Sequence, residues 1–108
     1  MTNRERVIDI SVRHKLSHAG SCLTALPIIE EIYAQKKPED KFILSSGHAH
    51  LAHAVVREAL GFEDAEKAIQ AYGIHCDRRA GCDVSTGSLG QGLPISVGIA
   101  LADRSKNV

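Results

Sequence analysis

The chain has 108 residues, which is enough for one small domain or for part of a larger one. Its 13 basic and 13 acidic side chains cancel, so no net positive charge is available to hold nucleic acid or an anionic membrane surface. No apolar run approaches the ~20 residues that cross a bilayer, and three cysteines behind a polar N-terminus favour a reducing compartment. We therefore expect a cytoplasmic protein without nucleic acid or membrane as partner.

The first helix is predicted from a start signal and an apolar period. Thr2 and Glu5 have the spacing of a capping box, and the helix is expected to run to about Lys15. Apolar residues recur there every four positions, which predicts that this face is buried. They are Ile8, Val12 and Leu16.

A second helix is predicted after a loop at residues 17–21. Its apolar stripe runs from Leu23 to Tyr33, and Pro27 is expected only in the first turn, because proline cannot donate a backbone hydrogen bond. A polar turn follows, and then the short apolar run Phe42-Ile43-Leu44, which is predicted to be a strand.

Three further helices are predicted in the second half. They cover about His48–Leu60, Asp64–Tyr72 and Ser88–Arg104, and the first two end at glycines suited to a C-terminal cap. Residues 74–87 between the last two are predicted to be an extended loop. The last helix has an apolar face formed by Leu93, Val97, Ala100 and Leu101.

The six histidines are the first candidates for chemistry. Four of them lie beside small, turn-forming residues, and imidazole exchanges protons near neutral pH. They are His18, His48, His50 and His75. His48, His50 and His53 also resemble a metallo-hydrolase ligand run, but Ala52 stands where that motif has aspartate.

The cysteines give a weaker signal. Cys76 and Cys82, with His75, could supply three metal ligands, but no fourth ligand follows at the usual zinc spacing. We therefore interpret these two as free, reduced thiols and predict no metal ligands in the chain. Cys22 lies near a helix start, where a thiol pKa can be lowered, but we interpret it as a packing residue.

The glycine-rich segment Ser85-Thr86-Gly87-Ser88-Leu89-Gly90-Gln91-Gly92 comes just before the last helix. Backbone without Cβ atoms lets a ligand touch the main chain, and a helix N-terminus favours anionic groups. The spacing alone also fits a tight turn with close helix packing.

Four features, in the same order along the chain, resemble the N-terminal part of transketolase, a thiamine-diphosphate enzyme. They are S-H-A-G at 17–20, D-K-F-I-L-S-S-G-H-A at 40–49, the loop residue His75, and V-S-T-G-S-L-G-Q-G at 84–92. The family has proline where this chain has Ala19 and Cys76. The resemblance implies the N-terminal segment of an α/β thiamine-diphosphate-binding fold, predominantly helical over residues 1–108 with one or two short strands.

The resemblance also implies an activity, which is the transfer of a two-carbon ketol unit between sugar phosphates in the pentose phosphate pathway. The cofactors it implies are thiamine diphosphate and Mg²⁺. The implied catalytic residues are His18, His48 and His75. The implied cofactor-binding residues are His48, Gly87, Ser88 and Leu89.

The metal-binding G-D-G motif of the family does not occur in the chain and would be expected just after residue 108. We therefore expect residues 1–108 to form an incomplete domain that is inactive alone and that joins a homo-oligomer or a partner chain. Two other functions remain open. One is a non-catalytic assembly subunit, and the other is a small metal hydrolase that uses His48, His50 and His53.

Overall fold

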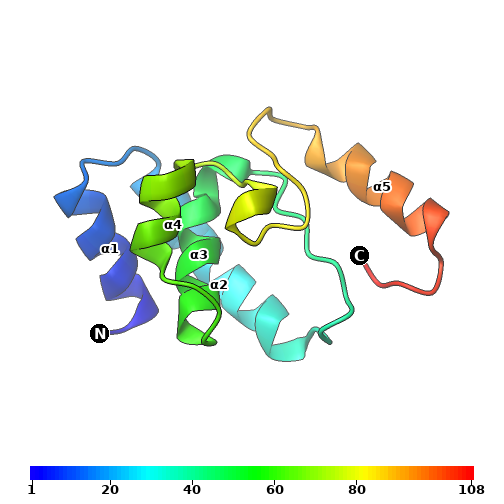
Figure 1. Cartoon of the computed structure of the whole chain (residues 1–108), viewed down its shortest axis with the longest axis horizontal. Coiled ribbons are helices and arrows are strands. Elements are labelled where there is room, and N and C mark those ends of the chain that lie inside the picture. Colours follow the sequence, from blue (N-terminus) through cyan, green and yellow to red (C-terminus); the bar gives the residue numbers. More distant parts are fainter.

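The computed structural model describes residues 1–108 as five α-helices and two short 3₁₀ turns. Helices α1 to α4 pack together, and α5 projects from one end of the molecule (Figure 1). The elements in chain order are α1 (Asn3–Arg13), α2 (Ala19–Gln35), η1 (Gly47–Ala49), α3 (His50–Ala59), α4 (Ala65–Tyr72), η2 (Arg78–Ala80) and α5 (Gly92–Ala102).

Helix α3 is the centre of the packed part. It contacts α1, α2 and α4, and its first seven residues, 50–56, are all buried. A helix that is covered on every side belongs to the core rather than to the surface. The helix predicted at 48–60 is thus confirmed, although its first turn is the 3₁₀ turn η1.

Helix α1 begins as predicted, because the Thr2 side chain accepts a hydrogen bond from the Glu5 backbone N–H at 3.1 Å. The predicted buried face is wrong, however. Ile8 is 41% exposed and Val12 is 70% exposed. The helix packs on α2 and α3 through a neighbouring stripe, so the buried residues are Val7, Ile10 and Ser11.

Helix α2 is longer than predicted, because it begins at Ala19 inside the expected loop. Pro27 therefore lies well inside the helix and not in its first turn. The helix tolerates it at an exposed position, although the proline cannot donate to the carbonyl of Leu23.

The predicted strand at Phe42-Ile43-Leu44 is not formed, and residues 1–108 contain no strand. A strand needs a neighbour to complete its ladder of hydrogen bonds. Around this segment we find single bonds instead. The Lys41 N–H donates to the carbonyl of Asn107 at 2.8 Å, and the Phe42 N–H donates to Asp83 Oδ2 at 2.9 Å. The structure is therefore helical where the resemblance implied short strands.

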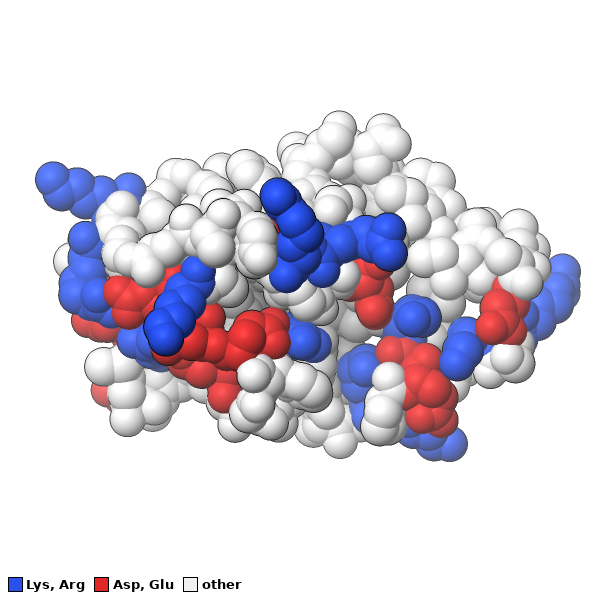
Figure 2. Space-filling view, viewed as in Figure 1, with Lys and Arg blue, Asp and Glu red and all other residues white.

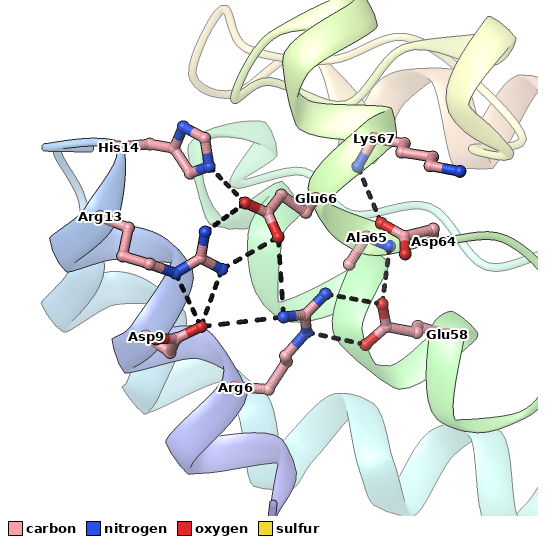
Figure 3. Close-up of polar contacts among 9 residues, drawn as sticks. All are labelled: Arg6, Asp9, Arg13, His14, Glu58, Asp64, Ala65, Glu66 and Lys67. Atoms are coloured by element: carbon pink, nitrogen blue, oxygen red, sulfur yellow. Dashed lines mark hydrogen bonds and ion pairs between the residues drawn. The ribbon is translucent and has the colours of Figure 1, made fainter.

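Charged side chains join α1 to the ends of α3 and α4 (Figure 3). Arg6 donates from Nε to Glu58 Oε2 at 3.1 Å, and Arg13 donates from Nη2 to Glu66 Oε2 at 2.9 Å. Asp9 also accepts from Arg13, at 2.8 Å. The Arg13 contact and a second one from His14 hold the pKa of Glu66 low, at about 2.

The surface carries mixed charge. Figure 2 shows blue and red side chains interspersed on the visible face, with a mostly white region along its upper part, which reaches the upper right where Figure 1 places α5. Several apolar side chains of α5 are exposed, namely Leu93, Val97 and Leu101. None of the helices is both long enough and apolar enough to cross a membrane.

Candidate functional site

Three histidines from separate chain segments meet at one place. His18 precedes α2, His48 lies in η1, and His75 lies in the loop after α4. The ring of His18 lies 4.9 Å from that of His48 and 6.3 Å from that of His75, between centroids. The structure thus brings together all three residues for which the sequence predicted a catalytic role.

The backbone of His18 is unusual, since it has the left-handed conformation with φ +67°. Such a conformation costs a non-glycine residue roughly 1 kcal/mol or more. It lets the chain turn sharply into α2 while the exposed ring stays beside His48. Strained residues of this kind gather at functional sites.

Close backbone contacts fix the segment that carries His48. Gly47 lies against Thr86, and a Cβ atom on Gly47 would fall only 2.5 Å from the Thr86 carbonyl carbon. The Gly47 carbonyl accepts from the Cys76 N–H at 3.1 Å, and the Thr86 N–H donates to the Cys76 carbonyl at 3.1 Å. Thr86 Oγ1 donates to the carbonyl of Leu44 at 2.7 Å. Three distant segments are therefore joined directly behind the histidines.

The glycine-rich segment continues this packing. A Cβ atom on Gly87 would lie 3.1 Å from His75 Cδ2, so the bare main chain of Gly87 faces the imidazole. Gly92, at the start of α5, is packed more tightly, since a Cβ atom on it would lie 2.6 Å from the Cα atom of Ser45. Ser88 and Leu89 are exposed in the turn between these two glycines. Of the predicted cofactor-binding residues, His48 and Gly87 therefore adjoin the histidine cluster, and Ser88 and Leu89 face outwards beside it.

An open groove of about 600 Å³ begins at His48. Its walls come from the first turns of α2 and from Ser46, and most of the lining side chains are small or hydroxylated. Small polar walls beside imidazoles suit a ligand rich in hydroxyl groups, because each hydroxyl can both donate and accept. The lining residues are Gly20, Ser21, Thr24, Ala25, Ile28, Ser46 and His48.

The histidines of the possible metallo-hydrolase run do not stay together. His48 lies with His18, whereas His50 and His53 are buried in α3 near two cysteines. The spacing of residues in the sequence does not predict that His50 and His53 lie beside the two cysteines. The one sequence signal for this group is that His50 and His53, three residues apart, share one helix face. Nothing in the sequence links these two histidines to Cys76 and Cys82.

The cysteines are all buried. Burial raises the pKa of the Cys22 thiol, which agrees with its interpretation as a packing residue. A hydrogen bond from the Cys76 thiol stabilises the Cys82 thiolate and holds the Cys82 pKa below its usual range. The two loop cysteines are therefore not isolated thiols at the surface.

Comparison with known families gives a match over residues 1–108, to the family described as "Transketolase, thiamine diphosphate binding domain". The chain is 32% identical to a subunit of the apulose-4-phosphate transketolase of Phocaeicola vulgatus, in a match over 93% of the chain and 42% of the relative. It is 34% identical to transketolase-like protein 2 of Bos taurus, in a match over 93% of the chain and 19% of the relative. A transketolase of Cereibacter sphaeroides is also 34% identical, over 68% of the chain.

The chain thus spans less than half the length of these relatives. No solved structure gives a significant match.

Proposed function

Because the chain belongs to the transketolase family through its thiamine diphosphate binding domain, we propose that it supplies part of the site for ketol transfer between sugar phosphates. The convergence of His18, His48 and His75 is the observation that carries this proposal. Imidazoles from three segments at one place can orient several hydroxyl groups of one sugar.

The residues present fit thiamine diphosphate. The main chain of Gly87 lies at the histidine cluster, where His75 takes the space that a Cβ atom would need, and this places the Gly87 backbone beside the imidazoles proposed to bind the cofactor and substrate. When bound, the cofactor supplies the nucleophilic carbon that takes up the two-carbon unit. We propose that Gly87 contacts its aminopyrimidine, that Leu89 packs on its rings, and that His48 and Ser88 bind near its diphosphate.

Besides orienting the sugar, the three histidines are proposed to form hydrogen bonds with its hydroxyl groups and to exchange protons during the reaction. We propose that His18 and His75 donate to hydroxyl groups of the sugar phosphate and that His48 stays close to the reacting carbon. A neutral imidazole can give a proton from one nitrogen and accept one at the other, so each ring can follow the shift of charge during the reaction. The position of His18 beside His48, which lines the groove of small polar residues, supports this role.

Mg²⁺ belongs to the same proposal as the counter-ion of the diphosphate. The motif G-D-G does not occur among the 108 residues, so we propose no Mg²⁺ ligand from this chain. We also propose that the protein acts in the cytoplasm.

A partner chain or a second copy is part of the proposal as well. The relative from Phocaeicola vulgatus is named as one lettered subunit of a transketolase, and its name therefore implies at least one further chain. In the present chain the exposed apolar side chains of α5 support an assembly of the same kind.

Activity measurements on the chain in its assembly, with its partner chain or a second copy, test this function. We expect ketol transfer between sugar phosphates that needs thiamine diphosphate and Mg²⁺, and a loss of about 10²-fold or more in kcat/KM for His18→Gln, His48→Gln and His75→Gln. His14→Gln is the matched control, because His14 contacts Glu66 and lies outside the histidine cluster. Full activity in all three variants, or no ketol transfer by the wild-type assembly, would contradict the proposal.

A further inference from the structure

Two histidines and two cysteines form a compact buried cluster that the proposed function does not use. His50 and His53 come from the first turn of α3, and Cys76 and Cys82 come from the loop after α4. The four side chains offer one ligand atom each, and these atoms all lie within 4.8 Å of one another. Exposure is 0% for His50, 2% for His53, 3% for Cys76 and 8% for Cys82.

Three nitrogen–sulfur separations within the cluster match those of a tetrahedral metal site. His50 Nδ1 lies 3.7 Å from Cys76 Sγ and 3.5 Å from Cys82 Sγ, and His53 Nδ1 lies 3.6 Å from Cys82 Sγ. A tetrahedral Zn²⁺ has Zn–S bonds of about 2.3 Å and Zn–N bonds of about 2.0 Å, which puts nitrogen and sulfur ligands about 3.5 Å apart. The nitrogen and sulfur atoms are thus already spaced for one ion between them.

The surroundings of His53 orient it as a ligand. Its Nε2 lies 2.7 Å from Tyr33 Oη, so an Nε2–H that donates to Tyr33 leaves the lone pair on Nδ1, which faces Cys82. A hydrogen bond at the second ring nitrogen is the usual support of a metal-binding histidine. Tyr33 and Phe42 also pack on the ring at 5.6 and 5.1 Å, between centroids.

The loop between the cysteines is folded to bring them together. Asp77 caps the turn η2 by accepting from the Arg79 N–H at 2.8 Å, and the Ala80 N–H donates to the Asp77 carbonyl at 2.9 Å. Gly81 then takes a left-handed conformation with φ +87°, which returns the chain so that Cys82 lies near Cys76. The five residues between the two cysteines therefore act as a ligand loop.

We propose that His50, His53, Cys76 and Cys82 bind one structural Zn²⁺ ion. Two soft sulfurs and two imidazoles in a tetrahedron are a typical donor set for zinc. All four positions are filled by protein and the site is buried, so the ion has no open position for a substrate. The ion fixes the loop 76–82 to α3. If the proposed function holds, it also steadies the neighbouring His75.

The metal content of the full-length protein tests this proposal without thiamine diphosphate, so its outcome is independent of the ketol-transfer activity. Protein purified under reducing conditions is analysed for zinc, and about one Zn²⁺ per chain is expected. Cys76→Ser and Cys82→Ser should lose the ion, and Cys22→Ser is the matched control, since Cys22 is an equally buried thiol outside the cluster. Zinc-free wild type, or zinc retained in both loop variants, would overturn the proposal.

A second measurement needs no variant and covers the case in which the substitutions unfold the chain. Wild-type protein is stripped with a chelator and titrated with Co²⁺, which should give the absorption bands of a tetrahedral site with thiolate ligands. Stripping should lower Tm by about 10 °C or more, and Zn²⁺ but not Mg²⁺ should restore it. An unchanged Tm, an octahedral Co²⁺ spectrum, or a Cys76–Cys82 disulfide that persists in protein purified under reducing conditions would count against the zinc site.

Discussion

At the scale of single residues, the candidate site depends on backbone contacts that only glycine permits. Gly47 and Gly92 lie so close to Thr86 and Ser45 that a side chain at either glycine would displace the neighbouring backbone. These two contacts join the segment around residue 45 to the glycine-rich segment, although about 40 residues separate them in sequence. The position of His48 therefore depends on the absence of a Cβ atom at Gly47 and at Gly92.

We predict that Gly47→Ala lowers the free energy of unfolding by about 1–3 kcal/mol, because the added methyl group overpacks a tight contact. Gly98→Ala is the matched control. Gly98 lies in α5 with open space where a Cβ atom would stand, so alanine should raise helix stability by up to about 1 kcal/mol. Urea unfolding of both variants measures the difference. Equal stability of the two variants would show that the contact with Thr86 is not tight.

The sequence predicts the histidine cluster because a resemblance links its members, whereas it groups the members of the second cluster with other partners. His50 and His53 stand in one possible ligand run with His48, and Cys76 and Cys82 in another with His75. Only the packing of α3 against the loop shows that the four ligand atoms meet. A ligand set formed by side chains that are distant in sequence can be recognised only once the folded structure shows that they lie together.

At the scale of elements, the helices were predictable from caps and apolar periods, but the buried faces and ends were less so. The burial of Val7 and Ile10 rather than Ile8 and Val12 depends on where α1 crosses α2 and α3, which a repeat of four residues does not specify. The expected strand at residues 42–44 failed for a related reason, because no neighbouring strand forms in residues 1–108 to share its ladder of hydrogen bonds. Periodicity predicts an element but not its neighbours.

Helix α2 lacks one backbone hydrogen bond at Pro27, and a substitution can restore it. We predict that Pro27→Ala raises the free energy of unfolding by about 2 kcal/mol, because alanine restores a backbone donor to the Leu23 carbonyl. The exposed position means that no core packing is lost. Thermal melts measure the change, and Ala25→Pro on the same helix should destabilise strongly. A Pro27→Ala variant with a lower Tm would mean that the proline is needed for the shape of α2.

The contact between α1 and α4 gives a pH prediction. The pKa of Glu66 is lowered to about 2 in the folded chain by Arg13 and then His14, below the ordinary value of 4.5. A lowered folded pKa contributes stability that is complete above about pH 4.5 and is lost as pH falls towards 2. We predict that Glu66→Gln removes this part of the acid dependence.

Urea midpoints between pH 2 and 6 measure the effect, with Glu39→Gln in the exposed turn after α2 as control. The wild-type and Glu39→Gln curves should fall together at low pH, and the Glu66→Gln curve should start lower and fall less. Three parallel curves would contradict the proposed role of the Arg13–Glu66 pair.

At the scale of the whole molecule, the four packed helices and α5 differ in what covers them. The core lies among α1 to α4, whereas Leu93, Val97 and Leu101 on α5 are 69, 50 and 62% exposed. Burying an apolar side chain of this size stabilises a folded or assembled protein by roughly 1.5–3 kcal/mol. Another protein surface that covered this face of α5 would therefore be bound favourably. The exposure of this face agrees with the proposed assembly.

We predict that Leu93→Ser with Leu101→Ser weakens self-association or partner binding at least tenfold. Sedimentation velocity over a range of concentrations measures it in the full-length protein. Ile8→Ser with Val12→Ser is the matched control, because these exposed residues lie on α1 at the other end of the molecule (Figure 1). A wild type that stays monomeric and unpartnered at all concentrations would show that the α5 face needs no cover.

The central claim is that the site around His48 and Gly87 holds thiamine diphosphate, and a crystal structure of the full-length protein with this cofactor and Mg²⁺ tests it most directly. We predict that the aminopyrimidine contacts the main chain of Gly87, that the diphosphate and the reacting carbon lie near His48, and that His18 and His75 face the space for the substrate hydroxyl groups. A bound cofactor that touches neither Gly87 nor His48 would contradict the account.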